Sequence, residues 1–376
     1  MTDLVRLQEI VWERYEDLLL IVRDPSKQIE IADPDGHAEK LLTALSAGPQ
    51  SPEELRQRLV TCGMDVTVRE VHDALDVLDS LALLSSGDGL EADDVADDDR
   101  YRSNLAFFEL FATRTRPSAA LQRDLMAAHV LQLGVGGVGS NVLQHLAGLG
   151  IGRLTLLDFD LVEPGNFARQ YAYRHQDIGR SKVRRAAEWV REFDPRIDVD
   201  VVECRVTGPQ DVASLLAGVD AVSAMIDRPV GVDHWVNEAC VRAGVPWVRA
   251  GIMGSRLGYF SVDPGRSACF ACHRRSSDRI TAGPGADGVA SRLNARLSGT
   301  LPNTANGPVA GLLAGYAAFE LLRYLTGYES PHVAGAHLYL DAAGHLAQRR
   351  EEWDVDADCR VCALAPNRSS LTAAAS

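Results

Sequence analysis

The sequence predicts an α/β sheet domain preceded by a small winged-helix-like α+β domain. From Tyr101 to Leu364, apolar strand-like runs alternate with helix-like segments, which is typical of an α/β sheet. A glycine-rich stretch, LQLGVGGVGSN at residues 131–141, has the pattern of a strand that turns into a helix. The first hundred residues differ, because two strand-like runs precede three helix-like segments. A chain of 376 residues is long enough for two domains.

Composition suggests where these domains begin and end. We expect the first domain over residues 1–90, an acidic solvated linker over 91–100, the sheet domain over 101–365 and a disordered tail over 366–376. The chain has no run of about 18 apolar residues, and its N-terminus lacks the pattern of a signal peptide. Its seven cysteines, an odd number, argue against a secreted disulfide framework. We therefore expect a cytoplasmic protein without membrane contact.

The first domain is predicted from local signals. Residues 14–32 hold two apolar runs around an Asp-Pro-Ser-Lys turn, which predicts a β-hairpin. A short amphipathic helix follows and ends at Gly48. Two capping boxes open the next two helices: Ser51 with Glu54, and Thr67 with Glu70. One face of the last helix is expected to carry Val71, Leu75, Leu78 and Ala82.

The negative charge of the chain is concentrated in this domain. Residues 1–100 hold 24 Asp and Glu against 9 Lys and Arg, whereas the whole chain holds 52 and 38. A winged helix that reads DNA needs cations to meet phosphates, so nucleic-acid binding is not expected. The excess acid indicates either a basic partner or simply a soluble surface.

The glycine-rich stretch predicts a phosphate-binding turn. Its glycines, Gly134, Gly136, Gly137 and Gly139, fit the pattern GxGxxG after a strand. Such a turn lets backbone N–H groups approach phosphate oxygens at the start of a helix. Asp158 lies 19 residues after Gly139, where an acid can bond ribose hydroxyls. This pattern suits a dinucleotide and ATP equally well.

The residues after the next strand favour ATP. The stretch DFDLVEPGNFARQ at residues 158–170 holds Asp158, Asp160 and Arg169, and Lys182 follows near a helix start. A triphosphate with Mg²⁺ needs a polar set of mixed charge, whereas a nicotinamide ring needs an apolar slot. We therefore predict ATP and Mg²⁺ as ligands of this site.

Two CxxC pairs predict a structural zinc site. The four cysteines are Cys269, Cys272, Cys359 and Cys362. Two thiolates at this spacing can chelate one side of a tetrahedron, so two pairs can close a Cys₄ site. Disulfides or a redox pair are the alternatives. His273, beside the first pair, is expected to be a bystander.

Several ordered motifs together resemble the ThiF-type adenylyltransferases, relatives of the ubiquitin-activating enzymes. They are GVGGVGSN, LLDFDLVEPGNFARQ, DIGRSK, the acid of SAMIDRP and the two CxxC pairs, over roughly residues 100–363. The resemblance implies a Rossmann-like ThiF-type sheet domain. It also implies residue roles: Asp158 on the ribose, Gln170 in support, Asp227 on Mg²⁺, and phosphate contacts from Asn166, Arg169 and Lys182. The family commonly has Asn after the acid at Asp227, and here Arg228 follows.

Two departures from the family concern its cysteine and its trans arginine. The segment between Cys272 and Cys359 holds no cysteine, which counts against covalent thioester chemistry. We expect this segment to contain a flexible loop that crosses over bound substrate. The family often has R-Y-x-R before its sheet domain, with the second arginine reaching the ATP of a partner subunit. Here the order is Arg100-Tyr101-Arg102-Ser103, so Arg100 or Arg102 is the candidate in an expected homodimer.

The first domain resembles the PqqD-type peptide-recognition domains of ribosomally made, modified peptides. The matching stretch runs from Glu16 to Leu59 and continues into a third helix. In that family a leader peptide adds a strand to the hairpin edge. A stabilising or dimerising appendage is the alternative. The two domains in this order resemble the microcin C-type peptide adenylyltransferases.

These observations predict an ATP-dependent adenylyltransferase that acts on a carboxylate of a ribosomally synthesised peptide. The expected catalytic residues are Arg169, Lys182 and Asp227. A sulfur-carrier adenylyltransferase of the thiamin or molybdopterin type is the second hypothesis. A non-catalytic scaffold that binds a leader peptide is the third, although such scaffolds usually lose the ATP residues.

Overall fold

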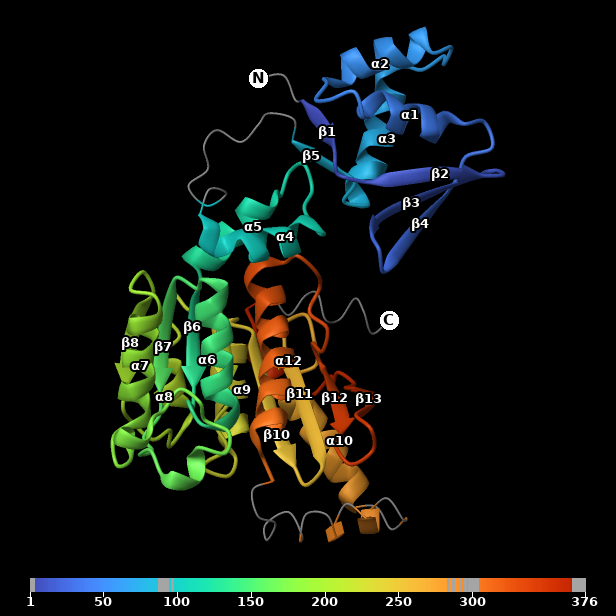
Figure 1. Ribbon diagram of the computed structural model, residues 1–376. Coiled ribbons are helices and arrows are strands. Elements are labelled where there is room, and N and C mark those ends of the chain that lie inside the picture. Colours follow the sequence, from blue (N-terminus) through green and yellow to red (C-terminus); the bar gives the residue numbers. More distant parts are fainter. Residues whose placement is uncertain are drawn as a thin grey trace. The chain divides into compact units, whose positions relative to one another are not determined.

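The computed structural model describes residues 4–86, 95, 98–282, 285, 288–290, 292–293, 296 and 304–366 (Figure 1). The chain forms two compact units, residues 1–124 and 125–376. Most of the expected acidic linker and of the C-terminal tail lies outside the described residues, as does part of the expected substrate-covering loop over residues 273–308. The prediction of a loop is wrong for residues 273–282, which belong to a helix that begins at Phe270. The segment from 101 to 124, which the sequence assigned to the sheet domain, groups with the first unit. Its contacts explain this, because Gln8 donates to Glu109 at 2.7 Å and Arg114 pairs with Asp76 at 2.8 Å.

The first unit contains the expected hairpin followed by three helices, together with further strands and helices before and after them. Its strands are β1 (Val5–Leu7), β2 (Val11–Tyr15), β3 (Leu18–Asp24), β4 (Lys27–Ala32) and β5 (Leu84–Ser86). Its helices are α1 (His37–Leu45), α2 (Pro52–Thr61), α3 (Val68–Ser80), η1 (Asp99–Tyr101), α4 (Arg102–Glu109) and the start of α5 (Ser118–Ala127). The β3–β4 hairpin and both capping boxes are confirmed.

Strand β2 is an addition to the predicted hairpin. It pairs antiparallel with β3, so the sheet order is β2-β3-β4. Leu19 and Ile21 of β3 are fully buried against the helices, in one core with Leu42 and Leu75. The prediction that Ala82 continues the face of α3 is wrong, since α3 ends at Ser80 and Ala82 has a φ of 56°.

The second unit is built on an eight-stranded mixed sheet, which confirms the predicted α/β class. The strand order is β13-β12-β11-β10-β9-β6-β7-β8. The strands are β6 (His129–Leu133), β7 (Arg153–Leu157), β8 (Asp198–Val202), β9 (Ala221–Ala224), β10 (Trp247–Met253), β11 (Arg256–Val262), β12 (Ala336–Asp341) and β13 (Ala347–Glu352). Neighbours from β10 to β8 run parallel, and β11 to β13 add antiparallel pairs.

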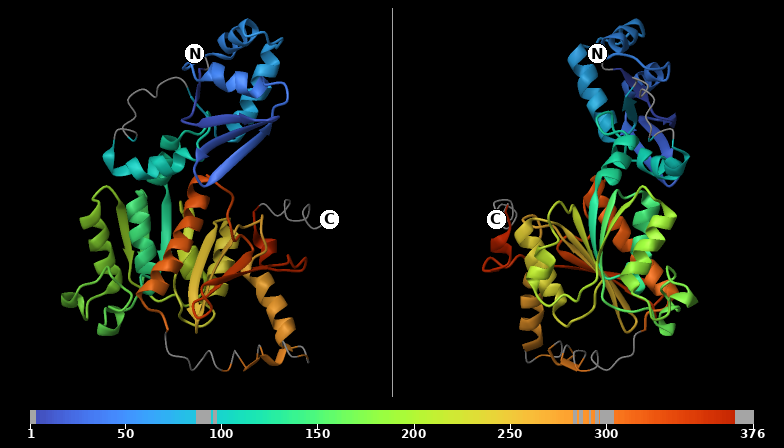
Figure 2. Two further views of the ribbon diagram at one scale, coloured as in Figure 1. Left: turned by 45° about the vertical axis from the view of Figure 1, so that its right-hand side comes forward. Right: turned by 90° about the vertical axis from the view of Figure 1, so that its left-hand side faces the viewer.

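Helices cover both faces of this sheet (Figure 2). One face packs against α6 (Gly137–Leu149), α7 (Lys182–Phe193) and α12 (Gly307–Thr326). The other packs against α8 (Pro209–Ala213), α9 (Val232–Ala243) and α10 (Phe270–Ala282). The unit also contains the short 3-10 helices η2 (Pro164–Asn166), η3 (His175–Asp177) and η4 (Cys362–Leu364). None of the helices in the described ranges is long and apolar enough to cross a membrane.

Candidate adenylate-forming site

A pocket lies where the strand order reverses in the sheet of the second unit. Strand β6 pairs with β7 on one side and β9 on the other, and both pairs are parallel. Ligands of open α/β sheets bind at the carboxyl ends of the strands at such a switch point. Most of the predicted site residues line this pocket: Gly134, Gly136, Gly137, Asp158, Asp160, Arg169, Gln170, Lys182 and Asp227. The structure therefore brings together residues that were predicted from separate motifs.

The glycine turn joins β6 to α6. Gly134 has a φ of +86°, and a Cβ there would lie 2.6 Å from the carbonyl oxygen of Met225. Helix α6 begins at Gly137, so its free N–H groups and its dipole lie at the pocket. Gly139 does not line the pocket. A Cβ at Gly139 would collide with the carbonyl oxygen of Gly134, so this glycine allows the turn and the helix to approach each other.

Replacing Gly139 by alanine should therefore damage the turn. We expect a loss of about 3 kcal/mol in the free energy of unfolding, because the methyl group meets rigid backbone. Gly148, in the same helix, has open space around its Cβ position, so Gly148→Ala should be stabilising by roughly 0.5–1 kcal/mol. Thermal unfolding and ATP binding of both variants provide the check. Equal behaviour of the two variants would contradict this role of Gly139.

Asp158 is held at the carboxyl end of β7. Its side chain is buried, its Oδ2 accepts from the N–H of Val135 at 2.8 Å, and its Oδ1 accepts from the N–H of Asp160 at 2.8 Å. Burial raises the pKa of Asp158, although these backbone donors and Lys182 oppose the rise. Both oxygens are thus fixed within the protein, and the carboxylate faces the pocket in one orientation.

Two cations approach the pocket from the segment after β7. Lys182, at the start of α7, is buried and its Nζ lies 3.0 Å from Oδ2 of Asp160. Arg169 is half-buried, and its guanidinium donates to the carbonyl of Gly165 at 3.2 Å. Asn141 of α6, which the sequence analysis did not single out, donates to the carbonyls of Gly137 and Arg169 at 2.7 and 3.0 Å. Asn141 thus connects the glycine turn to the backbone of Arg169 by hydrogen bonds.

The two predicted amides occupy different places. Asn166 is buried but does not line the pocket, and its Oδ1 accepts from the N–H of Glu163 at 2.9 Å. Gln170 lines the pocket, and its buried Oε1 has no hydrogen-bond partner among the described residues. A buried polar atom without a partner is costly, which is consistent with a polar ligand here.

Asp227 follows β9 and differs from Asp158 in exposure. Its side chain is 78% exposed, and its Oδ1 accepts from Arg249 at 2.8 Å. Arg228 also lines the pocket, as does Phe159, whose ring lies 4.2 Å from the guanidinium carbon of Arg205. Both stand within or beside the recognised motifs, Phe159 in LLDFDLVEPGNFARQ and Arg228 after the acid of SAMIDRP, but neither was predicted to line the site. An exposed carboxylate at the pocket suits a hard cation such as Mg²⁺.

Arg102, the predicted trans arginine, belongs to the first unit. Its side chain is exposed and pairs with Asp99. Arg100 lies in η1 of the same unit. The contribution of either arginine to a nucleotide stays a prediction.

The four cysteines of the CxxC pairs form one buried cluster. Their sulfur atoms lie 3.9 Å apart in Cys269–Cys272, 3.7 Å in Cys269–Cys359 and 3.5 Å in Cys272–Cys362. Tetrahedral zinc with bonds of about 2.3 Å would place its sulfur ligands about 3.8 Å apart. The cluster therefore fits a Cys₄ zinc ion. His273 stacks on Trp353 at 4.6 Å between ring centroids and is outside the cluster.

The remaining cysteines, Cys62, Cys204 and Cys240, do not line the pocket at the glycine turn. Cys240 is fully buried and Cys204 is partly buried, and burial raises the pKa of both thiols. Cys62 is exposed in the first unit. No cysteine of the described residues lines the pocket. Thiolate catalysis therefore has no candidate in the described part of this site.

Solved structures share this fold. The structure of E. coli MccB with ATP aligns with a TM-score of 0.70 at 19% identity, covering 96% of this chain and 99% of that one. The structure of the microcin C7 biosynthetic enzyme MccB with N-formylated MccA aligns with a TM-score of 0.69. At such identity the likeness establishes the fold.

Sequence relatives and a family model identify the family of this chain. Mouse adenylyltransferase and sulfurtransferase MOCS3 is 32% identical over 258 residues, 66% of this chain and 51% of that protein. The E. coli sulfur carrier protein ThiS adenylyltransferase is 28% identical over 212 residues, 56% of this chain and 77% of that protein. The chain thus spans about half the length of MOCS3. The ThiF family model matches residues 101–361, and the chain belongs to the ThiF family.

Proposed function

We propose that this protein is an ATP-dependent adenylyltransferase that activates a carboxylate of a ribosomally made peptide. The observation that carries this proposal is the convergence of Asp158, Arg169, Lys182 and Asp227 on one pocket beside the glycine turn. The family, and the names of the relatives as adenylyltransferases, support the reaction class. The test is release of pyrophosphate from Mg-ATP when a peptide is added.

In the proposed reaction, a carboxylate oxygen of the peptide attacks the α-phosphorus of ATP. A new oxygen–phosphorus bond forms, the bond from the α-phosphorus to the bridging oxygen breaks, and pyrophosphate leaves with that electron pair. Arg169 and Lys182 would neutralise charge that builds on the phosphates. The α6 N-terminus would bind a phosphate, and Asp158 would bind the ribose. Positioning and charge neutralisation supply most of the catalysis.

The pocket also suits Mg²⁺. Asp227 faces it with an exposed carboxylate, and Asp160 adds a second acid that is 51% exposed. Asp227 would hold the cation, which when bound would offset negative charge on the phosphates. The Cys₄ cluster would hold zinc in a structural role, since all four ligand positions of a tetrahedron are filled by protein.

The choice of a peptide as substrate rests on the similarity of nearly the whole chain to the MccB structures. The MccB structures, some with MccA, cover 96% of this chain, including its first unit. The relatives named as a sulfurtransferase and as a sulfur carrier protein adenylyltransferase match 66% and 56% of this chain, and they favour a second candidate function, activation of a carrier protein. Pyrophosphate release driven by a short peptide supports the first function, and release driven only by a Gly-Gly-ended carrier protein supports the second.

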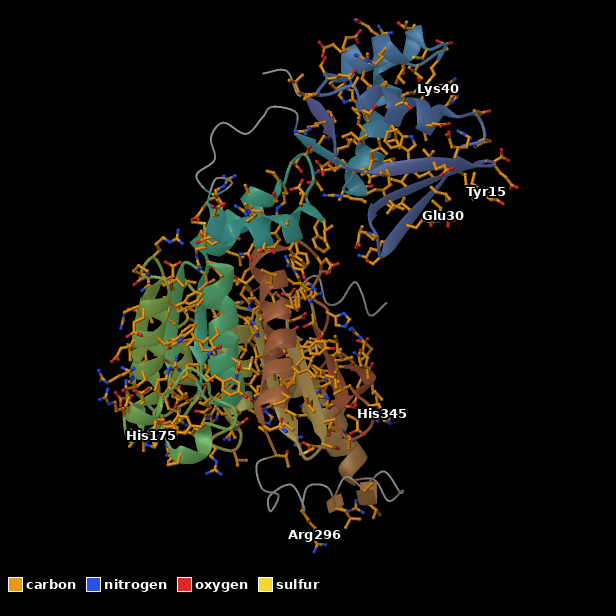
Figure 3. All side chains as sticks on the ribbon, viewed as in Figure 1. Tyr15, Glu30, Lys40, His175, Arg296 and His345 are labelled. Atoms are coloured by element: carbon orange, nitrogen blue, oxygen red, sulfur yellow. The ribbon has the colours of Figure 1, made fainter. Side chains whose placement is uncertain are left out.

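The first unit offers a sheet edge for the peptide. Strand β2 covers one side of the predicted hairpin, and among the described residues no strand pairs with the outer edge of β4. Ile29 and Ile31 of β4 are half-buried, whereas Glu30 between them is exposed. Figure 3 labels Glu30 on this strand. We propose that a leader peptide adds a strand to β4 through backbone hydrogen bonds.

Backbone methylation of the peptide tests this docking mode. In an added strand, alternate N–H groups point toward β4 and away from it. N-methylation at the inward positions should weaken binding to the full chain by about tenfold or more, since each methyl removes a hydrogen bond worth about 0.5–1.5 kcal/mol and adds a clash. Methylation at the outward positions should change little. A peptide found to bind equally well in both forms would exclude strand addition.

We also propose a homodimer in which Arg100 or Arg102 reaches the nucleotide of the partner. If so, Arg100→Ala or Arg102→Ala should slow adenylation about tenfold or more without changing thermal stability, because one cation near the phosphates is lost. Steady-state kinetics with Mg-ATP, together with the oligomeric state in solution, provide the check. Unchanged turnover in both variants would end this part of the proposal.

A further inference from the structure

Arg249 is a largely buried arginine beside the pocket, and the reaction proposed above assigns it no role. It lies on β10, next to β9 in the sheet, and β9 leads to Asp227. Its side chain is only 13% exposed, and the residues that follow it, Ala250 and Gly251, line the pocket. A buried guanidinium is costly unless charge partners and hydrogen bonds compensate it.

Two carboxylates compensate Arg249. Its Nη2 donates to Oδ1 of Asp227 at 2.8 Å, and its Nε donates to Oδ1 of Asp233 at 2.9 Å. The Nη1 group donates to the carbonyl of Ala250. Burial by itself lowers the pKa of Arg249, but Asp233 and Asp227 outweigh it and raise the pKa above its usual value. The guanidinium therefore stays charged and joins the first turn of α9 to the pocket.

The two carboxylates differ in what they face. Asp233 is 27% exposed and does not line the pocket, whereas Asp227 is 78% exposed and lines it. Arg249 occupies Oδ1 of Asp227, and Oδ2 accepts no hydrogen bond from the described part of the chain. An exposed aspartate alone would sample several rotamers and lose that freedom on binding a ligand. The pair with Arg249 removes much of this freedom in advance.

We infer that Arg249 is a positioning residue for Asp227, which it holds by one oxygen so that the other meets the cation of a metal–nucleotide complex. Asp233 balances the charge of Arg249, so the group formed by Arg249, Asp227 and Asp233 keeps a net negative charge. Hydrogen-bond partners of metal-binding carboxylates act in this way, and their loss typically costs about 10–100-fold in metal affinity or activity. This inference rests on the proposed function, because that function supplies the nucleotide and the cation.

The test compares nucleotide binding with and without metal. The full chain would be titrated with a non-hydrolysable ATP analogue by calorimetry, once with EDTA and once with Mn²⁺. The factor by which Mn²⁺ strengthens binding measures the metal interaction without any turnover. We expect Arg249→Met to reduce this factor about 10–100-fold and to leave binding in EDTA nearly unchanged. Arg249→Lys retains the positive charge but lacks the planar guanidinium that donates to both carboxylates. It should give a smaller reduction in the same direction.

Two further variants make the result specific. Arg242→Met removes a surface arginine that pairs with Glu238 on α9, and it should keep the full effect of Mn²⁺. In an Asp227→Ala background, Arg249→Met should cause no further loss of the Mn²⁺ effect, because Arg249 acts on the metal only through Asp227.

Retention of the full Mn²⁺ effect in correctly folded Arg249→Met, or in Arg249→Lys should the methionine variant not fold, would overturn the inference. Failure of the parent protein to bind the analogue at all would instead overturn the proposed function.

Discussion

Arg169→Ala should lower peptide-dependent pyrophosphate release by about 10²–10³-fold, the usual effect of removing one group that stabilises transition-state charge. Arg169 lines the pocket beside the glycine turn, and its side chain covers Gly137, so that a Cβ on Gly137 would lie 2.9 Å from its Cδ. The arginine thus lies against the N-terminus of α6, where phosphates are expected. The loss should appear in kcat more than in KM, because charge builds up during the reaction.

A surface arginine provides the control for this prediction. Arg184 on α7 is 66% exposed and pairs with Glu203, and it does not line the pocket. Arg184→Ala should retain nearly the full rate. The account of the site is wrong if Arg169→Ala loses less than about threefold while it still binds ATP.

Cys359→Ser should have the largest effect on stability. The cluster joins α10 to the segment around η4, and all four sulfurs are buried. Loss of one ligand should weaken zinc binding and remove part of the metal's folding free energy, which for structural zinc reaches about 10–16 kcal/mol. We expect a destabilisation of about 4 kcal/mol, or roughly 10 °C in the melting temperature of a unit of this size.

Metal content and a matched cysteine complete this prediction. The purified parent should hold one zinc per chain by elemental analysis, and Cys359→Ser should hold less. Cys62→Ser changes an exposed cysteine of the first unit and should alter neither zinc content nor melting temperature. A parent protein without zinc, or a disulfide in place of the free thiols, would show that the cluster has another role.

The site could be predicted where its residues follow strands of the parallel sheet. Gly134, Asp158 and Asp227 each come shortly after a strand, and parallel strands present their carboxyl ends at one edge. The order of strands therefore brings distant motifs to one pocket. The capping boxes of α2 and α3 could also be predicted, because each is a local signal that spans four consecutive residues.

Other features depend on contacts that no local pattern contains. Arg249 stands in a strand between apolar residues, and its partners Asp227 and Asp233 are 22 and 16 positions away. Strand β2, VWERY, places two charged residues side by side after Val11 and Trp12 and so lacks an alternating pattern, and it becomes a strand because β3 supplies its partner. The grouping of residues 101–124 with the first unit likewise arises from tertiary contacts such as Arg114 with Asp76.

The central claim is that this pocket forms an acyl-adenylate on a peptide. The most direct measurement is exchange of labelled pyrophosphate into ATP, with a panel of short peptides encoded beside the gene and of Gly-Gly-ended carrier proteins. We predict exchange that depends on one short peptide and disappears in Asp227→Ala. Exchange that depends only on a carrier protein would contradict the peptide as substrate, and tight peptide binding with no exchange would contradict catalysis.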